Sequence, residues 1–171
     1  MKKIIVIGCP GSGKSTFSKA LHEVTGLPLF HLDMMYWNED GTTVPKRIFM
    51  KRLGQTLKKE RWIIDGNYGS TMELRMRFCD TVFFLDYPLD VCINGIKSRK
   101  GKKRPDIPCT TLEDEDAEFM GFINNYRSVN RPVVMELLRK YSDKRIIIFE
   151  NRNEADDLLL RITSFEGVSL E

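Results

Sequence analysis

The stretch Gly8-Cys9-Pro10-Gly11-Ser12-Gly13-Lys14-Ser15 decides the fold of this chain. It matches the pattern G-x-x-x-x-G-K-[S/T], in which glycines let the backbone curl so that consecutive amides point at phosphate oxygens. The apolar run 4–7 before it predicts a buried strand, and the segment 15–24 after it has the apolar spacing of a helix. Because a helix adds its positive amino-terminal end to these amides, the sequence predicts a phosphate-binding loop here.

The side chains at the end of this loop suit a nucleotide triphosphate. Lys14 is a point charge for the outer phosphates, and the hydroxyl of Ser15 is a ligand for Mg²⁺, which takes few protein ligands and keeps water and phosphate oxygens. We therefore expect the residues of the loop and Thr16 after it to bind the nucleotide, with Lys14 also acting in catalysis.

Length and composition favour one ordinary globular domain over residues 1–171. The chain is 42% hydrophobic and 30% charged, with a net charge of +3 that is too small to indicate nucleic acid as a partner. Its apolar runs of about five residues are far shorter than a membrane helix needs. The apolar start at 4–7 is too short for a signal peptide, so we expect a cytoplasmic protein with no membrane partner. A monomer and a homodimer both stay open.

Short apolar runs alternate with longer mixed segments along the chain. Continuous runs of β-branched and aromatic residues are typical of strands that are buried on both faces of a parallel sheet. The strands are expected at 4–7, 28–32, 62–64, 82–85 and 146–149, and the helices at 15–24, 45–59, 71–78, 89–98, 119–129 continuing past Pro132 to 141, and 155–162. This alternation predicts an α/β fold with an open, doubly wound sheet.

Two aspartates follow predicted strands. Asp33 ends the second run and Asp65 the third, so both should lie at the carboxyl edge of the sheet, where ligands bind in open sheets. Asp65 is expected to serve Mg²⁺, with a turn aspartate before glycine as the alternative. Asp33 is expected to accept a proton from an attacking hydroxyl or to orient the acceptor, with a helix cap or turn residue as the alternative. Tyr36 and Trp37 could flank a planar or sugar-like acceptor, with core packing as the alternative for each.

A basic cluster lies in the second half of the chain. Its members are Lys97, Arg99, Lys100, Lys102, Lys103 and Arg104, and an acidic run follows at 113–118. We interpret it as a lid that closes over the phosphates, while a solvated charged face and a nucleic-acid patch remain alternatives. Arg127 and Arg131 are four apart, so they share a face if the helix is continuous through the region of Pro132.

Taken together, these segments resemble a known family, the adenylate-kinase-like P-loop kinases, and within it the FlaR-related branch usually labelled topology modulation protein. Besides the loop, the resemblance rests on His31-Leu32-Asp33 with Tyr36-Trp37, Trp62-Ile63-Ile64-Asp65-Gly66-Asn67-Tyr68, Leu85-Asp86-Tyr87-Pro88, Arg104-Pro105-Asp106, and Asn125-Tyr126-Arg127 with Arg131-Pro132.

The resemblance implies a P-loop three-layer sandwich with a five-stranded parallel sheet in the order 2-3-1-4-5 and a lid at about 99–118. It implies ATP and Mg²⁺, with Ser15 and Asp65 serving the metal. By matched position, Arg99 or Arg104 would lie near the donor, Arg127 and Arg131 near the transferring phosphate, and Arg152 beside the adenine.

The sequence departs from adenylate kinases after the third strand. Those enzymes follow the Asp-Gly with an aromatic residue, a proline and an arginine that help to bind a nucleoside monophosphate. Here Asn67-Tyr68-Gly69 stands, so the sequence does not identify AMP as the acceptor. We take Asn67, Tyr68 and Arg75 as acceptor-binding candidates, in an acceptor region of about 33–75.

The leading interpretation is an ATP- and Mg²⁺-dependent kinase that phosphorylates a nucleotide or another small hydroxylated metabolite. The alternative is an ATP-binding regulator linked to DNA topology, with weak hydrolysis only. A GTPase is a weaker third hypothesis, because the guanine-binding Asn-Lys-x-Asp pattern is absent from the sequence.

Overall fold

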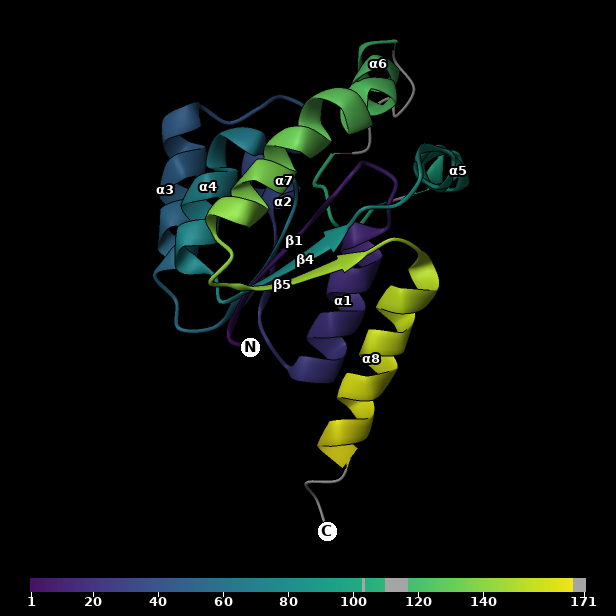
Figure 1. Ribbon diagram of the computed structural model, residues 1–171. Helices are drawn as coiled ribbons and strands as arrows, with labels where there is room; N and C mark the ends of the chain where they lie inside the picture. The colour runs from purple at the N-terminus through teal and green to yellow at the C-terminus, as the bar shows by residue number, and fades with distance from the viewer. Residues whose placement is uncertain (103, 110–116, 168–171) are drawn as a thin grey trace.

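Strands and helices alternate along the chain in a computed structural model that describes residues 1–102, 104–109 and 117–167 (Figure 1). The elements are β1 (Lys3–Gly8), α1 (Lys14–Thr25), β2 (Leu29–His31), α2 (Leu32–Tyr36), α3 (Lys46–Leu57), β3 (Trp62–Asp65), α4 (Gly69–Phe78), β4 (Thr81–Leu85), α5 (Leu89–Arg99), α6 (Ala117–Asn125), η1 (Tyr126–Asn130), α7 (Arg131–Lys140), β5 (Arg145–Phe149) and α8 (Arg152–Gly167).

The five strands form one parallel sheet in the order β2-β3-β1-β4-β5. This confirms both the five expected strands and their order. β1 is central, with Ile5 beside Ile64 of β3 on one side and beside Val82 of β4 on the other. Its residues Ile4 to Ile7 are completely buried, as the uninterrupted apolar run requires of a strand covered on both faces.

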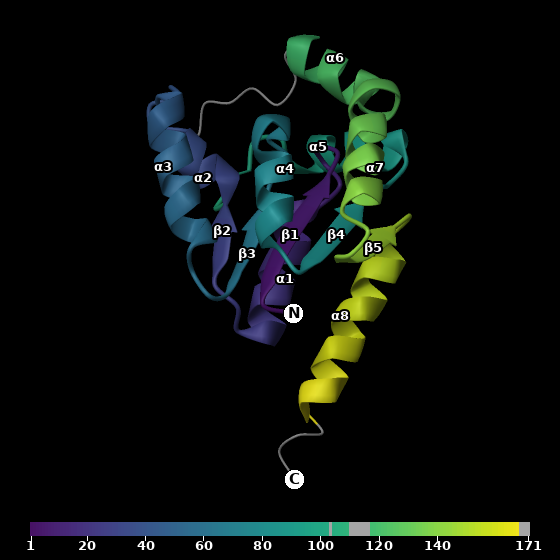
Figure 2. The ribbon, with the colours of Figure 1, turned by 60° about the vertical axis from the view of Figure 1, so that its left-hand side comes forward.

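Successive residues of each strand enter two separate cores, because side chains alternate across a sheet. Ile5 and Ile7 of β1 pack with side chains of α3, α4 and α7 on one face. Ile4 and Val6 pack with side chains of α1, α5 and α8 on the other. Figure 2 shows the sheet between these two helical layers. The predicted three-layer α/β architecture is therefore confirmed.

The short helix α2 corrects the expected position of Asp33. β2 ends at His31, and Asp33 lies in the first turn of α2 instead of at the end of the strand. Leu32 and Met35 of α2 are buried against the same core as α3, which stabilises a helix too short to leave a periodic pattern in the sequence. Asp33 nevertheless stays within two residues of the carboxyl edge of the sheet.

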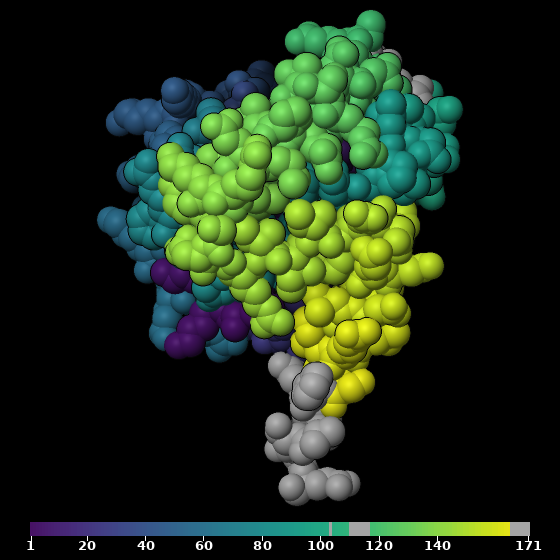
Figure 3. Space-filling view, in the orientation of Figure 1, coloured from purple at the N-terminus to yellow at the C-terminus, as the bar shows by residue number. Residues whose placement is uncertain are grey.

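A π-helical turn joins α6 to α7. The backbone N–H of Arg131 donates to the carbonyl of Tyr126, five residues earlier, and Pro132 opens α7. Because proline has no N–H to donate, the widened turn lets the two helices continue without a break. α7 and α8 then form neighbouring parts of the surface on the β5 side of the molecule (Figure 3). None of the helices among the described residues is long and apolar enough to cross a membrane.

Candidate active site

A cavity of about 790 Å³ opens at the carboxyl edge of the sheet. The phosphate loop, the ends of β2 and β3, the segment 104–107, α5, α6 and the start of α8 all contribute to its walls. Its lining includes the predicted residues Pro10, Gly11, Gly13, Lys14, Ser15, Thr16, Asp33, Trp37, Asp65, Asn67, Tyr68, Arg99, Arg104 and Arg152. Residues that lie far apart in the sequence therefore share one space.

The phosphate loop is held against α5 by a close glycine contact. A Cβ on Gly95 would lie 2.0 Å from the carbonyl oxygen of Gly11, and one on Gly11 would lie 2.0 Å from that of Cys92. Gly11 also has a φ of 80°, which favours glycine. Only glycine, which has no Cβ, lets the phosphate loop and α5 come this close. The contact holds the loop in place where it leads into α1. Gly8, Cys9 and Ser12 support the loop without lining the cavity.

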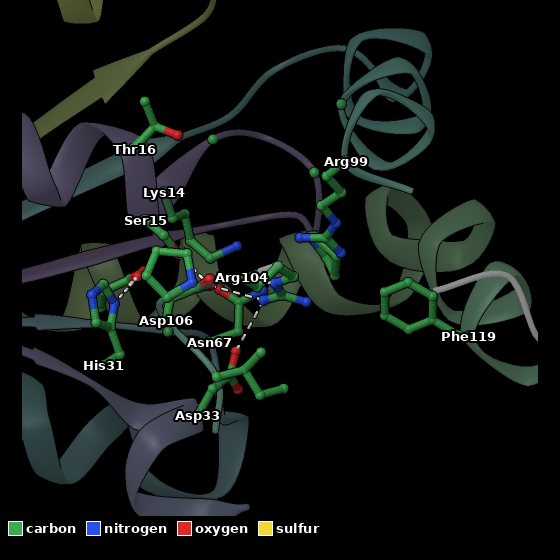
Figure 4. A pocket seen from close by; sticks show the side chains of 18 of the residues that line it. Lys14, Ser15, Thr16, His31, Asp33, Asn67, Arg99, Arg104, Asp106 and Phe119 are labelled. Carbon is green, nitrogen blue, oxygen red and sulfur yellow. Dashed lines mark hydrogen bonds and ion pairs between the residues drawn. The ribbon is translucent and has the colours of Figure 1, made fainter. Parts of the chain in front are cut away.

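Lys14 and Ser15 contribute a cation and a hydroxyl to the lining of the cavity (Figure 4). The ammonium of Lys14 donates to the carbonyl of Cys9 at 3.0 Å, so it lies along the loop that is to hold phosphate. Burial lowers the pKa of Lys14, while the charge of Asp65 acts in the opposite direction. The hydroxyl of Ser15 donates to Asp106 at 2.9 Å.

Asp33 lies across the cavity from the loop. Its carboxylate accepts a hydrogen bond from the Tyr68 hydroxyl at 2.7 Å and lies 3.5 Å from the Arg104 guanidinium. Burial raises the pKa of Asp33, although the bond from Tyr68 and the charge of Arg104 oppose this shift. A carboxylate with a raised pKa, next to the space where an acceptor would bind, suits a general base.

Asp65 ends β3 and pairs with His31 at the end of β2. One carboxylate oxygen lies 2.9 Å from Nδ1 of His31. Burial lowers the pKa of His31, but the hydrogen bond and charge of Asp65 outweigh it, so the net shift is upward. The other oxygen, Oδ1, is buried and has no hydrogen-bond partner among the described residues. Asp65 and Ser15 line the same cavity, and an unsatisfied carboxylate oxygen together with a hydroxyl fits a hydrated Mg²⁺, which prefers oxygen ligands.

Arg75 shapes the cavity from behind its wall. Its side chain is completely buried, and its guanidinium donates to the carbonyls of Gly66 and Tyr68, at 2.8 and 3.3 Å, and to that of Asn67. The loop held in this way presents the Asn67 side chain to the N–H of Gly8, at 3.0 Å, and the Tyr68 hydroxyl to Asp33. Tyr68 has a φ of 33°, which is uncommon for a residue with a side chain.

The segment after α5 brings its own pair of charges into the cavity. Arg104 contacts Asp106 through Nη2 at 2.8 Å and through Nε at 3.3 Å. Burial would raise the pKa of Asp106, but its bonds from Arg104 and Ser15 dominate and lower the pKa to about 2. Figure 4 shows the resulting chain of contacts from Ser15 through Asp106 and Arg104 to Asp33. Of the expected lid at about 99–118, Lys103 and residues 110–116 lie outside the described residues.

Besides Arg75 and the supporting loop residues Gly8, Cys9 and Ser12, three predicted residues lie outside the lining of the cavity. Arg131 pairs with Asp86, its Nη2 lying 2.7 Å from the carboxylate, and Arg127 is exposed on η1. Tyr36 packs against Phe49 and Tyr68. None of the three is among the lining residues. In this structure, then, the two arginines lie outside the group that surrounds Lys14.

Comparison with known proteins supports the fold. No family model and no curated protein matches the sequence significantly. Solved structures do match. The shikimate kinase from Acinetobacter baumannii in complex with shikimate has a TM-score of 0.61 at 18% identity, covering 99% of this chain and 95% of its own.

Two further shikimate kinases match over most of their length. The enzyme from Bacteroides thetaiotaomicron has a TM-score of 0.56 at 19% identity, covering 96% of this chain and 97% of its own. The enzyme from Aquifex aeolicus has a TM-score of 0.52 at 20% identity, covering 98% of each chain. The chain has the fold of P-loop kinases, and at these identities the likeness concerns the fold alone.

Sequence reasoning gave no role to Asp106 or Gly95, and it interpreted His31 as a packed or hydrogen-bonded residue, which agrees with its contact with Asp65. Asp106 belongs to a quoted motif, Arg104-Pro105-Asp106, but its contact with Ser15 joins segments 91 residues apart. The signal for His31 was its position two residues before Asp33, at the end of a strand. Gly95 sits inside a helix, where an isolated glycine is unfavourable unless something approaches closely, and this is a clue that the sequence offered.

Proposed function

We propose that this protein is a small-molecule kinase that transfers the γ-phosphoryl group of ATP to a hydroxylated acceptor. One observation carries the proposal: the phosphate loop with Lys14 and a carboxylate suited to be a base, Asp33, line the same cavity from opposite sides. A phosphate-binding protein that only hydrolysed or sensed nucleotide would not need the part of the cavity that lies around Asp33. The shared fold with shikimate kinases supports the same reaction class.

The residues suggest how transfer would proceed. The loop amides and Lys14 hold the phosphates, Arg152 borders the nucleotide base and Arg99 lies on the donor side. The acceptor hydroxyl gives its proton to Asp33 as its oxygen bonds to the γ-phosphorus. The bond from that phosphorus to the bridging oxygen breaks, and ADP leaves. Catalysis then rests on positioning and on charge stabilisation by Lys14 and Arg104.

Mg²⁺ belongs to this proposal through Ser15 and Asp65. When bound, the ion would neutralise part of the phosphate charge.

The acceptor would lie in the region 33–75 and the lid would comprise about 99–118. Arg127 and Arg131 would act near the transferring phosphate only after a rearrangement, since Arg131 is paired with Asp86 in this structure. A cytoplasmic location, a monomer or homodimer, and membership of the topology modulation branch stay predictions.

The DNA-linked regulator is the weaker alternative. Arg99, Lys102 and Arg104 of the basic cluster line the cavity, and Arg104 pairs with Asp33 and Asp106. Cations that line the same cavity as the phosphate loop favour a role in phosphate binding over a separate surface for DNA.

The direct test is phosphoryl transfer by a Lys14→Ala variant. ADP release is measured with ATP and Mg²⁺ against a panel of nucleosides, nucleoside monophosphates and hydroxylated metabolites. We expect turnover with at least one acceptor, and a loss of about 100-fold or more in the variant, because a charge that stabilises the transition state is removed.

Lys19→Ala is the matched control, because Lys19 lies on the same helix with an exposed side chain. It should retain full turnover, and circular dichroism should show both variants folded. Undiminished transfer by Lys14→Ala would refute the proposal.

A further inference from the structure

The lining of the cavity is divided by charge. Between residues 31 and 68, a stretch that the structure describes completely, the lining contains no lysine and no arginine. Its members there are His31, Asp33, Trp37, Asp65, Gly66, Asn67 and Tyr68. Among the described residues, the lysines and arginines of the lining come from the phosphate loop and from the second half of the chain, namely Lys14, Arg99, Lys102, Arg104 and Arg152. Figure 4 shows Arg99 on the far side of the cavity from Asp33 and His31.

The arginines that could have served an anionic acceptor are engaged elsewhere. Arg75 directs its guanidinium into the carbonyls of residues 66–68, behind the wall. Arg131 is paired with Asp86, with both of its contacting nitrogens within 2.9 Å of the carboxylate. Arg104 does reach the acceptor side, but there it faces Asp33 at 3.5 Å and Asp106 at 2.8 Å. The acceptor side therefore carries more negative than positive charge.

On the basis of the kinase function proposed above, we propose that the acceptor is an uncharged polyhydroxylated ring compound, and not a phosphate ester or a carboxylate. An anionic group on the acceptor would have to lie near Asp33 and Asp65, where 31–68 contributes no lysine or arginine to the lining, and where His31 and Arg104 are already paired with these two carboxylates. Like charges in a partly buried site repel strongly, since little water remains to screen them. The phosphates of the donor add further negative charge to the same space.

The same groups suit a sugar-like ring well. Asp33 accepts hydrogen bonds from hydroxyls, and the Tyr68 hydroxyl and the Asn67 amide can donate or accept. Trp37 lines the cavity and is only partly buried, so its indole offers aromatic surface against which the apolar part of a ring can pack. Few polar groups around an aromatic wall are typical of sites that fix a small ligand in one orientation.

Trp37 also provides a direct measurement of binding. The chain has two tryptophans, and the other, Trp62, is completely buried in β3. Changes in tryptophan emission on adding a ligand can therefore be assigned to Trp37 by their loss in Trp37→Phe. This readout needs neither ATP nor turnover, so it separates acceptor recognition from catalysis.

The experiment compares ligands that differ only in charge. Adenosine is titrated against AMP, and the methyl ester of shikimate against shikimate. We expect at least one of the two pairs to bind. In that pair, the uncharged compound should bind at least about tenfold more tightly than the anionic one. Equal or tighter binding of the anionic members would overturn the inference, as would binding of none of the four compounds.

Two variants test the charge argument separately from ring stacking. Trp37→Lys and Trp37→Gln both remove the indole, but only the first adds a cation. By calorimetry, Trp37→Lys should bind the anionic members more tightly than Trp37→Gln does, and the absence of any gain would overturn the charge argument. If uncharged compounds bind preferentially and yet no phosphorylated product forms with ATP and Mg²⁺, the acceptor class stands and the kinase proposal fails.

Discussion

Arg75 illustrates how one buried residue can organise a site from outside it. Its guanidinium replaces water for three carbonyls of the loop that carries Asn67 and Tyr68. Arg75→Met keeps the length of the side chain but leaves these buried carbonyls without donors. We expect it to lower the free energy of unfolding by about 2 to 4 kcal/mol, measured by urea denaturation.

Arg77→Met is the control for this prediction. Arg77 is exposed on the same helix and contacts Glu73 at 3.5 Å, so its loss should change stability little. Equal stability of the two variants would show that Arg75 does not support the loop.

The raised pKa of Asp33 predicts how the reaction depends on pH. Burial raises its pKa above the ordinary value of 3.8, so the carboxylate that acts as base forms only at higher pH. The value of kcat/KM should therefore rise with pH along an acidic limb centred above 3.8, and Asp33→Asn should lose this limb. Because the Tyr68 hydrogen bond holds the pKa down, Tyr68→Phe should move the limb to higher pH. A limb that stays in place in Tyr68→Phe would contradict this assignment.

At the scale of elements, the strands could be predicted because uninterrupted runs such as 4–7 and 82–85 leave few alternatives to burial on both faces. α2 could not, because five residues complete little more than one turn and show no periodicity. The contacts of Arg75 and Asp106 were also beyond prediction. Both side chains meet backbone or hydroxyl groups whose positions depend on how distant segments fold, and no local pattern encodes that.

The contact between α5 and the phosphate loop is the element-scale feature most open to test. Gly95→Ala puts a methyl group against the carbonyl of Gly11, and backbone on both sides must shift. We expect this variant to bind ATP at least about tenfold more weakly, measured by calorimetry, because the loop amides lose their alignment.

Gly54→Ala is the matched control. Gly54 also lies within a helix, but a Cβ there would meet nothing within 4 Å. Alanine should stabilise that helix by about 0.5 to 1 kcal/mol without affecting ATP binding. If both variants bind ATP normally, the close approach of α5 is not needed for the loop.

At the scale of the whole molecule, the site is formed by residues from both halves of the chain. The phosphate loop could be placed from sequence because its motif is local, and Asp33 and Asp65 because parallel strands end at one edge. The predicted cations Lys14, Arg99, Arg104 and Arg152 do line the cavity. That Arg75 and Arg131 do not could not be foreseen, because both have other partners in the folded chain. The division of charge across the cavity is thus a property of the tertiary structure.

Ligand-linked stability tests this arrangement over the whole molecule. A nucleotide that binds only the folded state at 100 times its dissociation constant should add about 2.7 kcal/mol of stability, which is about 5 to 10 °C in Tm for a chain of this size. With a non-hydrolysable ATP analogue, the increase in Tm should be larger with Mg²⁺ than with a chelator. The reason is that Ser15 and Asp65 offer oxygen ligands, which contribute to nucleotide binding only when a metal ion is present. Ser15→Ala keeps the loop amides and the pair between Arg104 and Asp106, so it should keep the metal-free increase and lose the additional one. A full Mg²⁺-dependent increase in Ser15→Ala would mean that the metal is held by other residues.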